Sequence, residues 1–232
     1  TILMPVFALF FPLEMAIALT GVVHLLNNLF KMYLVGKEAN WRIVIKFGAP
    51  AVISALIGAW LLMSFSETTE WYVYALGGKE FVITPIKVVV AFLMFGFAFL
   101  ELMPFFKKLE FAENKLFIGG VISGFFGGLS GHQGALRSAF LIKYGLSKES
   151  FIATGVMISS VIDISRVSVY FTKYISIGIE ENINLLLAAV LAAFAGALIG
   201  KKLLKKITTN FVQITVAVLI MLMAVAIGLG IV

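Results

Sequence analysis

Six long apolar segments dominate this chain of 232 residues and limit what it can fold into. They cover residues 13–34, 41–64, 81–103, 149–173, 183–204 and 209–231. Each is close to the roughly 20 residues that a helix needs to cross the hydrocarbon core of a bilayer. Hydrophobic residues make up 61% of the chain and charged residues 13%, which excludes an ordinary soluble domain. The segments therefore predict an all-α polytopic membrane protein whose surroundings are the lipid bilayer.

The charges between the segments predict their orientation, because Lys and Arg concentrate in cytoplasmic loops. Residues 31–46, the loop at 143–148 and the stretch after residue 200 are basic, and we expect them in the cytoplasm. The loops at 65–80 and 174–182 carry acidic residues and are expected outside. The net charge of +6 comes from these segment ends and not from one basic surface, so nucleic acid is not an expected partner.

A glycine-rich stretch at residues 115–145 interrupts this pattern, with seven glycines between positions 119 and 134. Both of its ends are basic and are therefore expected on the cytoplasmic side, so the stretch does not cross the membrane once. We interpret it as a re-entrant helical hairpin whose tip is Gly128–Gly134. Irregular backbone at membrane depth is tolerated only where protein buries it or where it lines a cavity.

The second half of the chain repeats the first, since matching residues recur in the same order along both halves. The matches include Glu14 with Glu149, Asn28 with Asp163, Lys31 with Arg166, and Ala55–Gly58 with Ala197–Gly200. The pattern predicts two inverted repeats, at residues 1–108 and 109–232, each a re-entrant hairpin followed by three transmembrane helices. The alignment also predicts that the first hairpin is truncated in this chain, its counterpart of the glycine-rich tip preceding residue 1.

The glycine-rich hairpin at Gly119–Gly134, the helix containing Ala153–Gly155 and the twofold repetition resemble the TauE/SafE (TSUP) family of sulfite and organosulfonate exporters. The resemblance covers essentially the whole chain, although Gly131–Gly134 replaces the frequent run of consecutive glycines with Gly-His-Gln-Gly. It implies a secondary transporter of the bacterial or archaeal cytoplasmic (inner) membrane. The expected substrate is a small sulfur-containing anion, moved outward by alternating access.

Four polar residues at or after the hairpin tip are candidates for substrate binding. Arg137 lies near the start of the returning helix, where free backbone N–H groups and the helix dipole favour an anion. Its guanidinium can donate two parallel hydrogen bonds to an oxyanion. Ser130, His132 and Gln133 can also contact the substrate, and His132 can carry a coupling proton. The alternative is that these side chains only satisfy the broken helix backbone.

Two other segments carry polar residues on one face. Asp163 and Arg166 are three residues apart, which predicts either a structural ion pair or a direct substrate ligand. The pair can serve as both by opening and re-forming as a gate during transport, and Asp163 is also a candidate for proton coupling. His24, Asn27 and Asn28 occupy the equivalent helix of the first repeat and are candidates for substrate binding, with His24 also a candidate proton carrier. By contrast, Lys31, Lys87 and Glu101 lie near segment ends, and we expect them to reach water as anchors.

Other functions remain as alternatives. An anion channel lined by the same hairpins is one, and an intramembrane enzyme is another, although the chain lacks H-E-x-x-H and G-x-S-x-G motifs. With no cysteine and no nucleotide-binding motif, we expect no cofactor and no metal site. The sequence leaves open a coupling proton, a coupling sodium ion and a homodimer.

Overall fold

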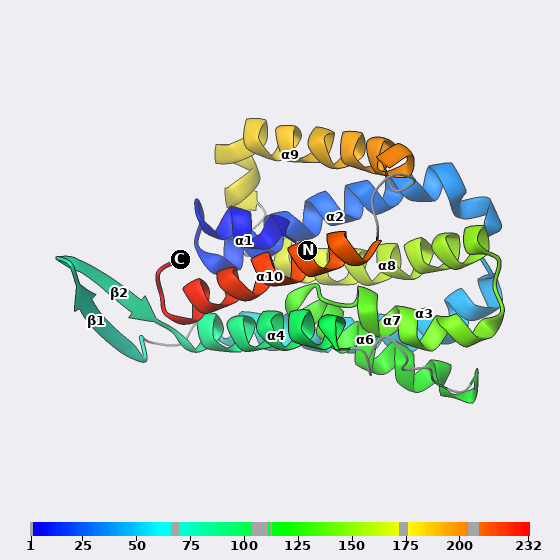
Figure 1. Cartoon of the computed structure of the whole chain (residues 1–232), viewed down its shortest axis with the longest axis horizontal. Helices are drawn as coiled ribbons and strands as arrows, with labels where there is room; N and C mark the ends of the chain where they lie inside the picture. The colour runs from blue at the N-terminus through cyan, green and yellow to red at the C-terminus, as the bar shows by residue number, and fades with distance from the viewer. Residues whose placement is uncertain (1, 66–69, 104–110, 112, 172–175, 204–208) are drawn as a thin grey trace.

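Helices form most of the computed structural model, which describes residues 2–65, 70–103, 111, 113–171, 176–203 and 209–232 (Figure 1). The helices are α1 (Leu3–Ala8), α2 (Leu13–Val35), α3 (Trp41–Phe65), α4 (Pro85–Leu102), α6 (Leu116–Ser130), α7 (Gly134–Leu141), α8 (Lys148–Tyr170), α9 (Ser176–Leu203) and α10 (Thr209–Gly228). Short 3-10 turns lie at Gly36–Glu38, Glu113–Lys115 and Ile142–Tyr144. The all-α prediction is confirmed.

Five of these helices, α2, α3, α4, α8 and α9, are long and apolar enough to cross a membrane. The last helix, α10, is also apolar, but its apolar part, Gln213–Gly228, is shorter. Each of the six apolar segments therefore corresponds to one helix. The prediction of a polytopic membrane protein is confirmed.

The third segment begins later than the sequence predicted. Residues 81–83 belong to β2 (Lys79–Ile83), which pairs antiparallel with β1 (Tyr72–Leu76) in a hairpin. Helix α4 starts only at Pro85, because Thr84 caps it by accepting a hydrogen bond from the backbone of Lys87 and proline suits the first helical position. The predicted loop at 65–80 thus contains most of a β-hairpin, which projects beyond one end of the helices (Figure 1).

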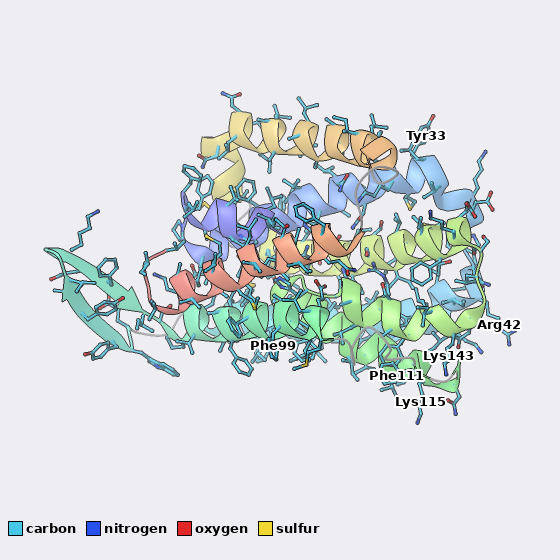
Figure 2. The ribbon with its side chains drawn as sticks, in the orientation of Figure 1. Tyr33, Arg42, Phe99, Phe111, Lys115 and Lys143 are labelled. Atoms are coloured by element: carbon cyan, nitrogen blue, oxygen red, sulfur yellow. The ribbon has the colours of Figure 1, made fainter. Side chains whose placement is uncertain are left out.

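The basic residues gather at the other end of the molecule. Arg42, Lys115 and Lys143 lie there, far from the β-hairpin (Figure 2). This arrangement agrees with the expected grouping of basic loops on one side. The predicted loops at 65–80 and 174–182 and the basic stretch after residue 200 lie in part outside the described residues, which omit 66–69, 172–175 and 204–208.

Close packing against α3 explains three of the glycines in α6. A Cβ atom placed on Gly120, Gly124 or Gly128 would collide with a backbone carbonyl of α3. The carbonyls concerned belong, in the same order, to Phe47, Ala51 and Ala55. Glycines at every fourth position form one helix face, and they let two membrane helices approach backbone to backbone.

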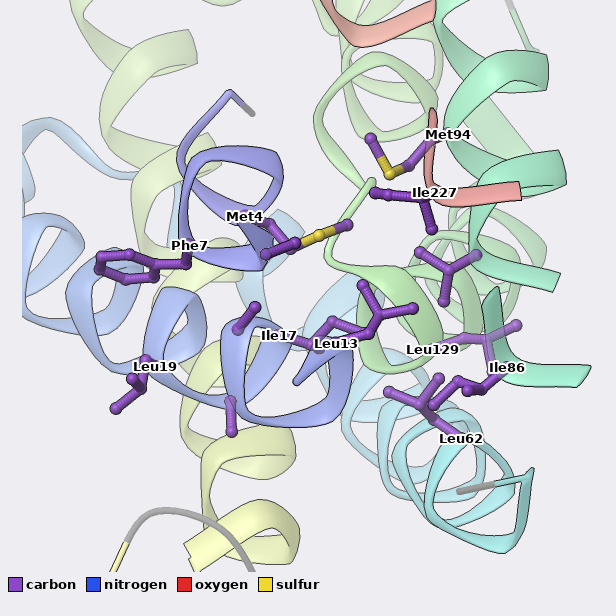
Figure 3. Packing of buried hydrophobic residues seen from close by; sticks show 14 of the residues in the cluster. Met4, Phe7, Leu13, Ile17, Leu19, Leu62, Ile86, Met94, Leu129 and Ile227 are labelled. Atoms are coloured by element: carbon purple, nitrogen blue, oxygen red, sulfur yellow. The ribbon is translucent and has the colours of Figure 1, made fainter. Parts of the chain in front are cut away.

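The largest apolar core lies between the N-terminal helices, α4 and α10. Met4 of α1, Ile17 of α2, Met94 of α4 and Ile227 of α10 belong to it, together with Leu129 from the end of α6 (Figure 3). Helices α2 and α8 pack against each other, as do α4 and α10. These pairs occupy corresponding places in the two predicted repeats, and the division at residues 108 and 109 stays a prediction.

Candidate functional site

A cavity of about 240 Å³ lies where the tip between α6 and α7 meets α2, α4 and α8. Its volume suits a small ion better than a drug-sized ligand, whose pockets measure roughly 300–1,000 Å³. Eight of the candidate residues line it: His24, Asn27, Asn28, Ser130, His132, Gln133, Arg137 and Arg166. The ninth, Asp163, is bonded to two of the lining residues. The structure thus brings the candidates together, and their roles in binding and coupling stay predictions.

The tip itself is a sharp reversal between two short helices. Gly131 ends α6 with φ of +78°, a left-handed conformation that glycine adopts without strain. Neighbouring groups satisfy the carbonyls at the end of α6: the N–H of Gly131 bonds to Gly127, and the hydroxyl of Tyr170 bonds to Gly128. The expected hairpin, two helices that meet at the glycine-rich break, is therefore present in the structure, and its re-entry on one side of the membrane stays a prediction.

The two ring nitrogens of His132 have different surroundings. Its Nδ1 lies 3.0 Å from the carbonyl oxygen of Ser130, so the Nδ1–H group donates a hydrogen bond to that carbonyl and helps to satisfy the broken helix. Its ring stacks on Phe97 of α4, with ring centroids 6.1 Å apart. The other ring nitrogen, Nε2, is buried and His132 lines the cavity.

Arg137 lies one turn into α7 and reaches across to α8. One guanidinium nitrogen, Nη1, donates a hydrogen bond to the hydroxyl of Ser159. Gly155 of α8 makes room for the side chain, since a Cβ atom there would lie 3.3 Å from Nε of Arg137. Gly134 and Ala135, the first residues of α7, line the same cavity. The positive end of α7 and the arginine therefore act on the same space.

The predicted pair of Asp163 and Arg166 is a buried ion pair, and each residue is only 1% exposed. Two nitrogens of Arg166 lie 2.9 Å from Oδ1 of Asp163. The second carboxylate oxygen accepts a hydrogen bond of 2.7 Å from the side-chain amide of Asn28 on α2. The predicted meeting of the Asn28 and Asp163 faces is confirmed, and the three residues join α2 to α8.

Two residues of the cavity wall were not expected at the site from the sequence. Lys31 and Glu101, expected as anchors that reach water, both line the cavity. Their distance from the segment ends said nothing about which way each helix face turns, so the sequence did not place them at the cavity, and their role as anchors stays a prediction. For Lys31 a signal existed, since it continues the spacing of His24 and Asn28 along one face of α2. Thr20, one turn before His24, and Ser159 also line the cavity.

A second cavity, of about 230 Å³, adjoins the first. Both are lined by Asn28, Lys31, Arg137 and Ser159, so these four residues separate the two spaces. The second cavity continues along α7 and the first turns of α8, past Leu141 and Phe151. This direction leads to the end of the molecule that carries the basic loops (Figure 2).

Among the described residues, no group of three or more His, Cys, Asp or Glu side chains is placed to hold a metal ion. The polar groups at the cavity are instead cationic, amide and hydroxyl groups with two imidazoles, of His24 and His132, and one carboxylate. Such a set can bind a small oxyanion through charge and hydrogen bonds.

Comparison with known proteins gives one match. The model of the family described as sulfite exporter TauE/SafE matches residues 1–227. No curated protein and no solved structure matches the chain. The family match covers nearly the whole chain and agrees with the helices described above, so this integral membrane protein belongs to the TauE/SafE family of sulfite exporters.

Proposed function

We propose that this protein is a secondary transporter that moves a small sulfur-containing anion outward through the central cavity by alternating access. The observation that carries the proposal is the position of Arg137, which lies beside the cavity at the start of α7. An arginine at membrane depth is costly unless it is paired or has a function.

The charges around the cavity leave Arg137 as the cation for the substrate. Arg166 is neutralised by Asp163. The cavity wall also carries one lysine, Lys31, and one acid of opposite charge, Glu101. Among the described residues, the Arg137 guanidinium donates a hydrogen bond to the neutral hydroxyl of Ser159. An oxyanion that binds Arg137 therefore supplies the missing negative charge and accepts donors from a fixed, planar group.

The other cavity residues have complementary roles in this proposal. Asn27, Asn28 and Gln133 contact the bound anion beside Arg137, with His24 and Ser130 completing the wall. His132 carries a coupling proton through Nε2, the ring nitrogen that does not bond to Ser130. The ion pair of Asp163 and Arg166 holds α2 and α8 together in this state and rearranges when the repeats rock against each other.

The two adjoining cavities support a pathway toward the basic end of the molecule. Arg137, Lys31, Asn28 and Ser159 lie between them, so a substrate bound at Arg137 leaves the central cavity by passing this group. In alternating access, the constriction opens the binding site to one side of the membrane only while the path to the other side is closed.

The first test is binding and transport by Arg137→Ala in proteoliposomes, with sulfite and an organosulfonate as substrates. Loss of charge-assisted hydrogen bonds should weaken binding by about 10- to 100-fold. The matched control is Arg42→Ala, which removes an exposed arginine at the basic end of the molecule. Unchanged binding by Arg137→Ala would remove this residue from the site.

The same vesicles distinguish a carrier from an anion channel. A carrier exchanges labelled substrate against unlabelled substrate, so uptake driven by counterflow should saturate with concentration. Large single-molecule currents in a planar bilayer would instead establish the channel alternative.

A further inference from the structure

Unpaired polar atoms lie in the described residues of the cavity wall, and three of them are hydrogen-bond acceptors that an oxyanion without a hydrogen cannot satisfy. Four buried side-chain atoms have no hydrogen-bond partner among the described residues: Oγ1 of Thr20, Oδ1 of Asn27, Nε2 of His132 and Oε1 of Gln133. All four residues line the central cavity. Buried polar atoms are nearly always hydrogen-bonded in folded proteins, and one left unpaired is destabilising.

The protonation of His132 follows from its geometry. Because Nδ1 faces the carbonyl oxygen of Ser130 at 3.0 Å, Nδ1 must carry the hydrogen. In the neutral imidazole the other nitrogen, Nε2, then has a lone pair and no hydrogen. This lone pair is buried at the cavity and can accept a hydrogen bond.

Two side-chain amides add carbonyl oxygens to the same wall. Gln133 is 6% exposed and lies next to His132 at the tip, and its Oε1 is unpaired. Asn27 brings Oδ1 from α2, on the face that also carries Thr20. The carboxylate of Glu101 lies on the wall as well, and it too only accepts hydrogen bonds when ionised.

These acceptors stand in the same cavity as the donors of Arg137 and Lys31. A fully deprotonated oxyanion has only acceptors, so it satisfies the cations and leaves the acceptors unpaired. An anion that also carries an O–H or N–H group satisfies both. From this arrangement we infer that the substrate is a sulfur oxyanion carrying a hydrogen-bond donor, which His132, Gln133 and Asn27 recognise.

This inference rests on the proposed transport function and narrows its substrate class. Two kinds of compound share the required chemistry: a protonated inorganic anion, hydrogensulfite, and a sulfonate whose carbon chain ends in a hydroxyl or ammonium group. Both have one anionic oxygen group for Arg137 and one donor for the acceptor side of the cavity.

Binding of two isosteric sulfonates to the purified protein tests the inference. Isethionate ends in a hydroxyl group, whereas 1-propanesulfonate has a methyl group at the same place, and both stay anionic at any working pH. We expect isethionate to bind at least about tenfold more tightly, because the methyl group leaves buried acceptors unpaired. Calorimetric titration measures both affinities.

Variants then identify the acceptors. His132→Asn keeps a side-chain N–H near the carbonyl of Ser130 and removes Nε2, and Gln133→Met removes an acceptor with little change in size. Each should reduce the preference for isethionate over 1-propanesulfonate severalfold, because only isethionate has a donor for the removed acceptor. The control is Gln213→Met, the same substitution at an exposed position of α10, which should alter neither affinity.

Titration with sulfite separates the two sources of the donor. If hydrogensulfite is the ligand, the apparent affinity for total sulfite falls as the pH rises, because deprotonation removes the form that binds. Isethionate binding at the same pH values should change less. Equal binding of isethionate and 1-propanesulfonate by the unmodified protein would overturn this inference and leave the proposed function standing. Absence of binding by every sulfur anion would instead overturn the proposed function.

Discussion

The two parts of the glycine-rich hairpin are held in different ways. The first limb, α6, is held by shape, because Gly120, Gly124 and Gly128 let its backbone touch the carbonyls of α3. The tip is held by polar groups, since hydrogen bonds from neighbouring helices and side chains satisfy its broken backbone. The same residue type, glycine, therefore serves packing in one part and chain reversal in the other.

This difference teaches where the function lies. The glycines of α6 face another helix and have no space for a ligand, so their abundance is a packing signal. Gly131 and Gly134 lie at the cavity, with Arg137 and His132 beside them. Changes in α6 should thus act on stability, and changes at the tip should act on both stability and binding.

The largest expected effect comes from Asp163→Asn, which leaves Arg166 buried without its counter-charge. The Arg166 guanidinium lies beside the tip, since a Cβ atom on Gly131 would be 2.7 Å from its Nη1. Breaking a buried ion pair by removing one partner costs about 3–5 kcal/mol of folding free energy. Thermal or denaturant unfolding in detergent micelles measures the loss. Glu149→Gln, which neutralises an exposed acid on the same helix, should cost less than about 1 kcal/mol. Similar losses in the two variants would contradict the polar anchoring of the tip.

Gly124→Ala probes the packed limb. The added methyl group would meet the backbone of α3, with Cα of Ala51 only 2.6 Å away, so we expect a loss of about 1–3 kcal/mol. The matched control is Gly96→Ala in α4, where nothing lies within 4 Å of the new Cβ atom. There alanine should stabilise the helix, by up to about 1 kcal/mol. If both variants were stabilised, close contact would not be the reason for the glycine in α6.

The smallest effect concerns the boundary between the two parts, where the hydroxyl of Tyr170 donates a 2.5 Å hydrogen bond to the carbonyl of Gly128. Tyr170→Phe leaves that carbonyl buried and unpaired, for a loss of about 1–2 kcal/mol in unfolding measurements. Tyr33→Phe, which removes a hydroxyl from an exposed position, should change stability by less than about 0.5 kcal/mol. Equal stability of the two variants would show that water or another donor satisfies Gly128.

Much of the fold followed from the sequence. Long apolar runs require helices in a bilayer, because backbone groups there must be satisfied within their own segment. The glycine-rich break between Lys115 and Lys143 likewise predicted a hairpin, since both ends are basic. The start of α4 could not be predicted from hydropathy, because residues 81–83 are as apolar in a strand as they would be in a helix.

The sequence predicted most of the residues that form the site, but less of how they are arranged. Spacing placed His24, Asn27 and Asn28 on one side of a helix, and the repeat placed Asn28 opposite Asp163. Spacing could not place Lys31 and Glu101 at the cavity, because proximity to a segment end is compatible with either water or the interior.

The sequence by itself determined the helices, the hairpin and the set of polar residues that a bilayer makes costly. The tertiary structure decided which of them meet: the glycines of α6 pack on α3, Arg166 pairs with Asp163, and Arg137 faces a cavity with unpaired acceptors. The physical reason is that helix formation depends on local hydrogen bonds and hydropathy, whereas a binding site depends on which helix faces come together.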